Sequence, residues 1–332
     1  RPPRVAERDR EPALERLADA QAPAVAPGEK VSGGTGLLRA QAICPAWGFY
    51  RYRLGAEALG TAVEGLAPME RGTLVHGALE RFWRETGSLA GLQALAAAAR
   101  RGRIAAAVAG ALEEFETAAR RLPPRFRALE AGRLERQLDA WLALEATRPG
   151  DFTVVACERE ATLEIEGIRV RTIIDRIDRL PDGRCLVIDY KTGRAIDTRN
   201  WGEARLTEPQ LPLYAAIAVP QDGGEAVAGV AFAKVVLDGA AFAGVGESGD
   251  LLPGMVGLDN PKRRTFPADA FPDWPALLRH WHERLHAVAA EVGRGEAAVC
   301  FGDVAALRYC EVLPLLRLAE REAQWEAACA GA

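Results

Sequence analysis

Two aspartates and one lysine stand at the ends of two apolar runs in the middle of the chain. Asp175 follows the run at 173–174, and Asp189 and Lys191 close the run at 186–188. Because successive side chains on a strand alternate between its two faces, Asp189 and Lys191 point the same way. If the two runs form neighbouring strands, both carboxylates and the ammonium group meet at one end of a sheet.

That combination of groups suits the hydrolysis of a phosphodiester. Two carboxylates can hold a divalent cation that prefers oxygen ligands. Such a cation polarises a phosphoryl oxygen and lowers the pKa of its bound water, and a lysine stabilises charge that develops on the phosphate. A plain Asp–Lys ion pair at a strand end has the same spacing, so spacing alone leaves both interpretations open.

Strand patterns surround these residues, and helical patterns lie before and after them. Alternating or continuous apolar runs predict strands over 152–157, 161–165, 168–174, 184–190 and 227–237. The turn residues Glu166-Gly167 and Pro181-Asp182-Gly183 predict hairpins between them. Helical spacing predicts helices near 36–41, over 73–85, in several pieces across 88–147, over 208–219 and 274–292, and across most of 304–330, with glycine-rich loops at 238–254. The result is a mixed sheet flanked by helices, an α/β or α+β fold.

The same patterns divide the chain into four stretches of one compact domain. Residues 1–35 have the composition of a linker or arm. Residues 36–150 form a helical N-terminal region, residues 151–240 form the core sheet, and residues 241–332 form loops and helices that pack back on the core. We expect the chain, which begins at Arg1, to be part of a larger protein.

Composition narrows the class of protein. The net charge of −4 argues against a protein that coats nucleic acid without specificity, although a local basic groove stays compatible with it. No apolar run approaches the length of a membrane span. The six cysteines are scattered without paired spacing and predict free thiols, so we expect a cytoplasmic location.

Five motifs occur in a fixed order along the chain. They are C-P-A-W-G-F-Y-R-Y at 44–52, R-G-T-L-V-H-G-A-L-E at 71–80, D-R-I-D at 175–178, I-D-Y-K-T-G at 188–193 and Q-L-P-L-Y at 210–214. Together they resemble the nuclease domain of RecB/AddB-type helicase–nucleases, within the PD-(D/E)XK superfamily. A lone D-x-K would be a weak signal, whereas five collinear motifs across most of the chain are specific.

The resemblance implies a restriction-endonuclease-like α/β fold and a role for each matching residue. It makes His76, Asp175 and Asp189 the ligands of Mg²⁺ or Mn²⁺, with the backbone carbonyl of Tyr190 as a fourth, and Lys191 the catalytic lysine. Gln210 and Tyr214, one helical turn apart, are expected to flank that lysine or the DNA backbone.

Further residues are assigned more loosely. Glu158 falls where relatives often carry an acidic residue, and helical spacing puts Glu80 on the same helix face as His76, where it is expected to orient the imidazole. A positive rim for DNA is expected from Arg51, Arg53, Arg176 and Arg194.

The chain departs from the family pattern at the place where relatives often bind an iron–sulfur cluster. Cys44 and Cys310 stand at two of the four cluster positions, but Leu307 and Leu316 occupy the others. Two thiolates cannot hold a four-cysteine cluster. We therefore expect no iron–sulfur cluster, and expect these four side chains to pack together in an apolar patch. Thr172 also replaces a glycine that is usual in the family.

A second metal-binding motif competes with the first. His282-Glu283-Arg284-Leu285-His286 matches H-E-x-x-H, in which two histidines on one helix face bind zinc and the glutamate acts as general base of a metallopeptidase. A solvated helix face rich in Arg, His and Glu is the commoner explanation of so short a pattern.

These observations favour a metal-dependent DNA nuclease, expected to be an exonuclease in DNA repair or recombination with a helicase domain or subunit as partner. Two alternatives stay open: a catalytically inactive nuclease fold that binds DNA or serves as a scaffold, and the zinc metallopeptidase.

Overall fold

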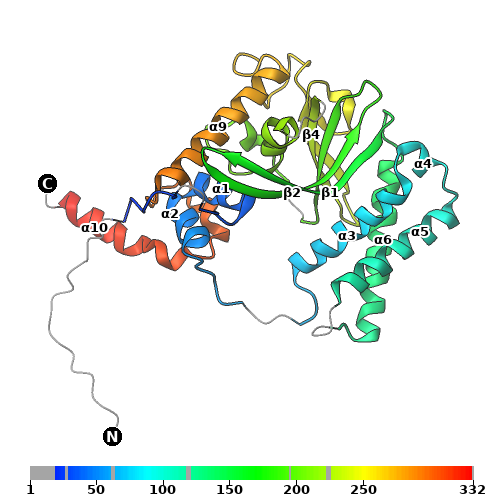
Figure 1. Cartoon of the computed structure of the whole chain (residues 1–332), viewed down its shortest axis with the longest axis horizontal. Coiled ribbons are helices and arrows are strands. Elements are labelled where there is room, and N and C mark those ends of the chain that lie inside the picture. Colours follow the sequence, from blue (N-terminus) through cyan, green and yellow to red (C-terminus); the bar gives the residue numbers. More distant parts are fainter. Residues whose placement is uncertain are drawn as a thin grey trace, which may run out of the picture.

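A twisted mixed sheet forms the centre of the molecule and carries helices against both faces (Figure 1). The computed structural model describes residues 19–26, 29–60, 64–116, 121–193, 196–221 and 226–330. Within these ranges the sheet has six strands, whose spatial order follows the chain: β1 (Thr153–Ile165), β2 (Ile168–Arg179), β3 (Cys185–Lys191), β4 (Val227–Lys234), β5 (Ala241–Gly246) and β6 (Met255–Gly257).

The strand pairing is antiparallel except at two places. β1, β2 and β3 form an antiparallel meander, β3 pairs in parallel with β4, β4 is antiparallel to β5, and β5 is parallel to β6. The β1–β2 turn is made by Glu166 and Gly167, with φ of 50° and 76°. Both lie in the left-handed region that a tight hairpin turn requires, so the hairpin predicted at this dipeptide is confirmed.

Helices precede, interrupt and follow the sheet. They are α1 (Gly34–Ile43), α2 (Pro45–Gly48), η1 (Phe49–Arg53), α3 (Pro68–Thr86), α4 (Leu89–Gln93), α5 (Ala97–Phe115), α6 (Pro124–Glu145), η2 (Arg199–Gly202), α7 (Gln210–Leu213), η3 (Tyr214–Ala218), α8 (Val219–Gln221), η4 (Gly249–Leu251), α9 (Trp274–Arg294), η5 (Val304–Tyr309), η6 (Leu313–Leu316) and α10 (Leu318–Ala330). No helix in the described part of the chain is both long enough and apolar enough to cross a membrane.

The two faces of the sheet have separate hydrophobic cores. On one face the core joins α1, α7, η3 and α9 to the sheet and includes Val187 of β3. On the other face it joins α3, α5 and α6 to the sheet and includes Leu186 and Ile188 of the same strand. β3 is therefore buried on both sides, as its continuous apolar run predicts, and its end is held rigidly between the two layers.

Three features of the sheet differ from the sequence-based expectation. The strand expected over 168–174 continues to Arg179, so Asp175 lies within β2 rather than at its end. The patterns at 152–157 and 161–165 belong to one strand, β1, rather than two. β5 lies in the stretch 238–254 that was expected to be glycine-rich loop, and β6 follows it where no strand was predicted. Glycine at position 244 is required by the sheet itself. A Cβ on Gly244 would lie 2.2 Å from the carbonyl oxygen of Val230, so only glycine lets β5 approach β4 this closely.

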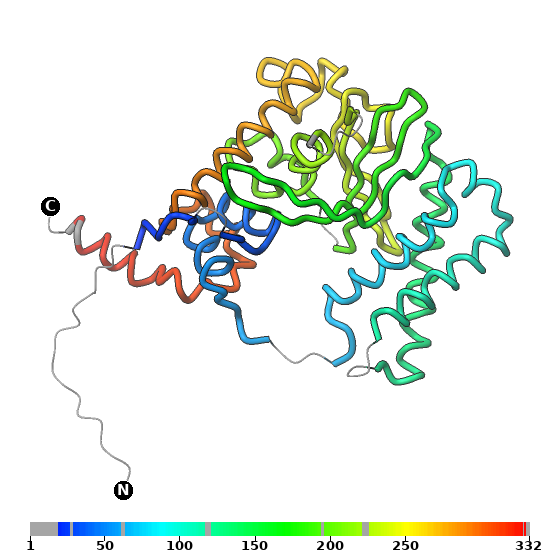
Figure 2. The backbone as a smooth tube through the Cα atoms, in the orientation of Figure 1, coloured from blue at the N-terminus to red at the C-terminus, as the bar shows by residue number. Residues whose placement is uncertain are grey.

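The N-terminal segment of the described chain packs against the end of α9. Residues 19–26, assigned to a linker from composition, pair with the end of α9: the Ala22 amide donates to the Gly295 carbonyl (2.8 Å) and the Val25 amide to the Gly293 carbonyl (2.9 Å). Residues 1–18 of the expected arm lie outside the described residues. Figure 2 shows the first helices, in blue, beside the orange and red C-terminal segment.

A third hydrophobic cluster joins α1 and α2 to the C-terminal segment. It contains the four residues at the family's cluster positions, namely Cys44, Leu307, Cys310 and Leu316. The apolar patch predicted from the sequence is thus present. Burial raises the pKa of the Cys310 thiol to about 11, so this cysteine stays protonated at neutral pH.

Candidate metal centre and active site

Glu158 on β1 stands opposite Asp175 on β2. Flanking residues of the two strands pair in register, for example Arg159 with Ile174. The backbone at Glu158 has a φ of 46°, in the left-handed region that a glutamate rarely adopts. Unusual backbone of this kind costs stability and concentrates at functional sites. Here it places a second carboxylate beside Asp175.

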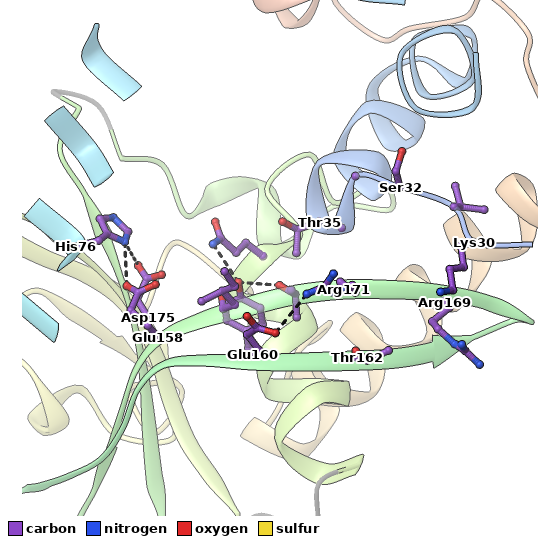
Figure 3. A pocket seen from close by; sticks show the side chains of 17 residues that line it. Lys30, Ser32, Thr35, His76, Glu158, Glu160, Thr162, Arg169, Arg171 and Asp175 are labelled. Carbon is purple, nitrogen blue, oxygen red and sulfur yellow. Dashed lines mark hydrogen bonds and ion pairs between the residues drawn. The ribbon is translucent and has the colours of Figure 1, made fainter. Parts of the chain in front are cut away.

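Helix α3 brings His76 to these carboxylates. The helix begins at Pro68, where the Glu70 carboxylate accepts a hydrogen bond from the Ala67 amide (2.8 Å), and it ends at Gly87 with a φ of 70°. Its buried side chains at helical spacing are Leu74, Val75, Ala78, Leu79, Phe82 and Trp83. This apolar stripe fixes the rotation of the helix, so that His76 lies at the edge of the packed face and points at the sheet (Figure 3).

The imidazole of His76 contacts three groups of the sheet. Nδ1 lies 3.3 Å from Oε1 of Glu158 and 3.4 Å from Oδ2 of Asp175. Nε2 lies 3.1 Å from the backbone carbonyl oxygen of Tyr190. One ligand atom from each of His76, Glu158 and Asp175 can be chosen so that all lie within 4.8 Å of one another. We call these three residues the metal-site triad.

Asp189 lies beside the metal-site triad and pairs with the lysine of its own strand. Its side chain is 1% exposed, and Lys191 Nζ lies 2.6 Å from its Oδ2. Asp175 is tied to the same strand end, because its Oδ2 accepts a hydrogen bond from the Tyr190 amide (2.7 Å). Asp175 in the middle of β2 and the end of β3 therefore present two carboxylates and one ammonium group together.

Gln210 and Tyr214 extend this arrangement from α7 and η3. Lys191 Nζ donates to Oε1 of Gln210 (2.9 Å), and Nε2 of Gln210 donates to the Tyr214 hydroxyl (3.1 Å). That hydroxyl in turn accepts from Oγ1 of Thr172 (3.0 Å) and donates to the Ile173 carbonyl. Thr172, which departs from the family glycine, thus has a partner in the site. The connected polar groups restrict the lysine to one orientation.

The charged groups of the site lie close together, and this shifts the pKa values of His76 and Asp189. Burial alone lowers the pKa of His76, but hydrogen bonds to Asp175 and Glu158 outweigh it and raise the pKa to about 10. Burial, followed by the charge of Asp175, raises the pKa of Asp189 well above the ordinary range of an aspartate. The site brings three carboxylates, of Glu158, Asp175 and Asp189, together with two basic groups, of His76 and Lys191. This excess of acidic groups favours a bound divalent cation.

The donor set fits such a cation. The side chains of the metal-site triad offer carboxylate oxygens and one imidazole nitrogen close together. The buried carboxylate of Asp189, which the sequence predicted as a ligand, lies beside this group but does not belong to it. Among the described residues Oδ1 of Asp189 has no hydrogen-bond partner, and a buried carboxylate oxygen without one is costly unless an ion compensates it. Oxygen-rich sites of this kind suit Mg²⁺ or Mn²⁺.

The structure changes the roles expected for two glutamates, Glu158 and Glu80. Glu158 belongs to the metal-site triad rather than lying behind it. Glu80 pairs with Arg84 one turn along α3 (2.6 Å) instead of with His76. Glu158 follows a break in the alternation of its strand, so its position could not be derived from strand periodicity.

Of the arginines predicted to form a DNA-binding rim, Arg176 lies in the core, so that prediction is wrong. It is 0% exposed, and its guanidinium contacts the carboxylates of Asp178 (2.6 Å) and Glu145 (2.7 Å) and covers the ring of Trp83. A residue enclosed in this way cannot reach DNA. Alternation along β2 directs this side chain into the core. There the guanidinium is stabilised by attraction to the two carboxylates and by stacking on the ring of Trp83.

Two other arginines of the predicted rim are paired with carboxylates of the chain itself. Arg51 pairs with Glu311 (2.9 Å) and Glu57 (2.8 Å), joining η1 to the C-terminal segment. Arg53 pairs with Glu29 (3.3 Å) and is mostly buried. Both side chains are thus engaged in ion pairs within the molecule. Arg194 lies outside the described residues.

The H-E-x-x-H segment lies on α9, away from the metal-site triad. The rings of His282 and His286 stack with their centroids 4.1 Å apart, and Nδ1 of His286 lies 2.7 Å from Oε1 of Glu166 at the β1–β2 turn. Glu283 is largely exposed beside Arg284. In the described part of the chain no group of three metal-ligating side chains forms around these histidines. The segment connects α9 to the hairpin, and the geometry gives no support to a peptidase.

Comparison with known proteins agrees with this arrangement. The family model for the PD-(D/E)XK nuclease superfamily matches residues 37–315, which include every candidate site residue named above. A comparison with curated proteins found no match. The mixed six-stranded sheet with helices on both faces is the restriction-endonuclease-like α/β fold that the motifs predict. The chain belongs to the PD-(D/E)XK nuclease superfamily.

Proposed function

We propose that this chain is a divalent-metal-dependent deoxyribonuclease that hydrolyses phosphodiesters beside Asp175 of β2 and the end of β3. One observation carries the proposal: His76, Glu158 and Asp175 converge within 4.8 Å beside the Asp189–Lys191 pair, whose separation is 2.6 Å. A structural ion pair at a strand end needs neither the imidazole nor the strained glutamate that accompany this one.

Some residues of the site would hold a cation, and others would stabilise the negative charge that develops on the phosphate. The metal-site triad, Asp189 and the Tyr190 carbonyl would hold Mg²⁺ or Mn²⁺, which supplies polarisation of the phosphoryl oxygen and a more acidic water. Lys191 places a positive charge where negative charge develops on the phosphate. Gln210 keeps that ammonium group in place through its 2.9 Å contact, so little reorganisation is needed during the reaction.

Finer assignments rest on the order of the five motifs. We infer that the chain is of the RecB/AddB type, acts as an exonuclease on DNA in repair or recombination, and works in the cytoplasm with a helicase domain or subunit. The support for these inferences is the resemblance at 44–52, 71–80, 175–178, 188–193 and 210–214. No Walker-type phosphate loop occurs in the sequence, so ATP hydrolysis is assigned to the partner.

The proposal is tested with labelled single- and double-stranded DNA in Mg²⁺, Mn²⁺ or EDTA. Wild-type protein should cleave in either metal and stop in EDTA. Asp175→Asn should lose at least about a hundredfold in rate, whereas Asp182→Asn, in the exposed turn after β2, should cleave at the wild-type rate. A folded wild-type protein that binds DNA but cleaves none under any condition would favour the inactive scaffold instead.

A further inference from the structure

A groove leads away from the metal-site triad along the β1–β2 hairpin. Its volume is about 930 Å³. One wall is formed by residues 30–35, before and at the start of α1, and the floor is formed by the two strands (Figure 3). We call it the hairpin groove. Its lining includes Lys30, Thr35, Glu160, Arg169, Arg171 and Ile173.

The floor of the hairpin groove presents a regular row of side chains. Asp175, Ile173, Arg171 and Arg169 are alternate residues of β2, and the residues between them are buried. Alternate residues on one strand face lie about 6.6–6.8 Å apart. That interval is comparable with the distance between successive phosphates of an extended single strand of nucleic acid. Figure 3 shows Arg171 and then Arg169 following Asp175 along the hairpin.

Positive charge prevails in this part of the groove. Lys30 and Arg169 are exposed, and neither forms an ion pair with another described residue. Arg171 lies 3.3 Å from the carboxylate of Glu160, but the two side chains are 78% and 73% exposed. An exposed pair of this kind contributes little to stability, so a phosphate can replace Glu160 as the partner of Arg171.

Between the metal-site triad and the arginines, β2 presents one apolar side chain to the groove, next to Glu160 of β1. Ile173 is 46% exposed on the groove floor, although it is a large hydrophobic residue on a strand whose other face is packed. An exposed isoleucine beside cations gives a base or sugar a surface to pack on, while the arginines bind the backbone. Thr35 adds a hydroxyl to the facing wall.

We propose that the hairpin groove binds the backbone of one extended DNA strand next to the scissile phosphate, with successive phosphates at Arg171 and at Arg169 with Lys30. This inference rests on the proposed nuclease function and specifies its substrate as single-stranded. In a duplex the backbone winds around the helix axis, so its phosphates depart from a straight row of side chains. An unpaired strand can follow the row.

The binding test uses labelled oligothymidines of increasing length, measured by fluorescence anisotropy in EDTA so that no cleavage occurs. For wild-type protein, affinity should rise with length until the groove is filled. In Arg169→Ala/Arg171→Ala that rise should be lost, with affinity for the longer strands falling by about tenfold or more. The slope of log affinity against log salt should become shallower by about 1.4, or about 0.7 for each phosphate contact removed.

Two further variants sharpen the test. Glu160→Gln removes the carboxylate that competes for Arg171, and it should tighten single-strand binding. Arg264→Ala removes an exposed arginine of the loop after β6, outside the groove, and it should bind as wild type does. If Glu160→Gln weakens binding, or if Arg264→Ala costs as much as the double variant, the assignment to this groove is wrong.

Competition with unlabelled blunt duplex addresses the choice of substrate. Single strands should displace the labelled oligothymidine at lower concentration than duplex of equal length, and the double variant should reduce that preference. If the double variant loses affinity for single strands and for duplex equally, the single-strand assignment is wrong.

Wild-type hydrolysis of bis(p-nitrophenyl) phosphate, which is too short to reach Arg171, tests the proposed chemistry separately. Suppose that wild-type protein hydrolyses this diester and that the double variant binds oligothymidine with wild-type affinity. The proposed nuclease function would then stand, and the proposal that the hairpin groove binds DNA would be wrong.

Discussion

Glu158 faces Asp175 across the β1–β2 pair, and His76 lies within 3.3–3.4 Å of both carboxylates. Two carboxylates this close repel each other, and the unusual backbone at Glu158 adds to the cost. A cation bound between these groups would offset the repulsion, and each ligand can be tested separately.

Glu158→Gln should weaken Mn²⁺ binding by at least about tenfold, because it removes one of the charged oxygens of the metal-site triad. Isothermal titration calorimetry measures the effect directly. Glu164→Gln is the matched control, since Glu164 is an exposed glutamate farther along the same strand. Equal Mn²⁺ affinity of Glu158→Gln and wild type would exclude Glu158 as a ligand.

Metal binding should release a proton and become tighter as pH rises. Hydrogen bonds to Asp175 and Glu158 raise the pKa of His76 to about 10, so at neutral pH the imidazole is protonated and a metal must displace its proton. The affinity for Mn²⁺ should therefore increase from pH 6 to pH 9, by close to tenfold per pH unit for the one proton that His76 releases. Calorimetry in buffers of different ionisation enthalpy counts the protons released. His76→Asn should abolish the release attributed to this group, and an unaltered release in that variant would contradict the assignment.

Arg176 should be a structural residue rather than a DNA contact. Arg176→Met leaves the buried carboxylates of Asp178 and Glu145 with Arg148 as their one remaining ion-pair partner in the described part of the chain, and should lower the free energy of unfolding by about 3–5 kcal/mol. Urea denaturation provides the measurement, with exposed Arg264→Met expected within about 0.5 kcal/mol of wild type. A stable Arg176→Met variant with impaired DNA binding would reverse this assignment.

The apolar patch at the C-terminal segment should hold the two ends of the domain together without iron. Leu316 is 0% exposed and Leu315 is 44% exposed. Leu316→Ala should therefore cost about 2–5 kcal/mol of unfolding free energy, and Leu315→Ala far less. The purified protein should also be colourless and contain no stoichiometric iron by elemental analysis. Brown protein with stoichiometric iron would contradict this prediction, because Cys44 and Cys310 alone cannot ligate a cluster.

The parts of the fold that could be predicted are those in which one local pattern dominates. The apolar run of β3 is buried on both faces, so both its length and the position of Asp189 at its end followed from the sequence. His76, Gln210 and Tyr214 come from other elements, and only their resemblance to known motifs linked them to β3. Spacing carries no information on which helix faces which strand end.

The parts that could not be predicted depend on tertiary contacts. Glu158 interrupts the alternation of β1 through its backbone, and Arg176 resembles any surface arginine until the carboxylates and aromatic rings around it are known. β5 was missed because glycines such as Gly244 are depleted in strands on average, although here the missing side chain permits the close approach to β4. In each case the packing of a neighbouring element outweighs the local pattern.

The central claim is that Lys191 and the carboxylates beside it carry out phosphodiester cleavage, and single-turnover kinetics test it most directly. Cleavage of labelled single-stranded DNA in saturating Mn²⁺ should be at least about a hundredfold slower for Lys191→Ala than for wild type. Lys262→Ala, which removes an exposed lysine of the loop after β6, should cleave at the wild-type rate. Cleavage by Lys191→Ala at the wild-type rate, still inhibited by EDTA, would contradict the account and place the active site elsewhere.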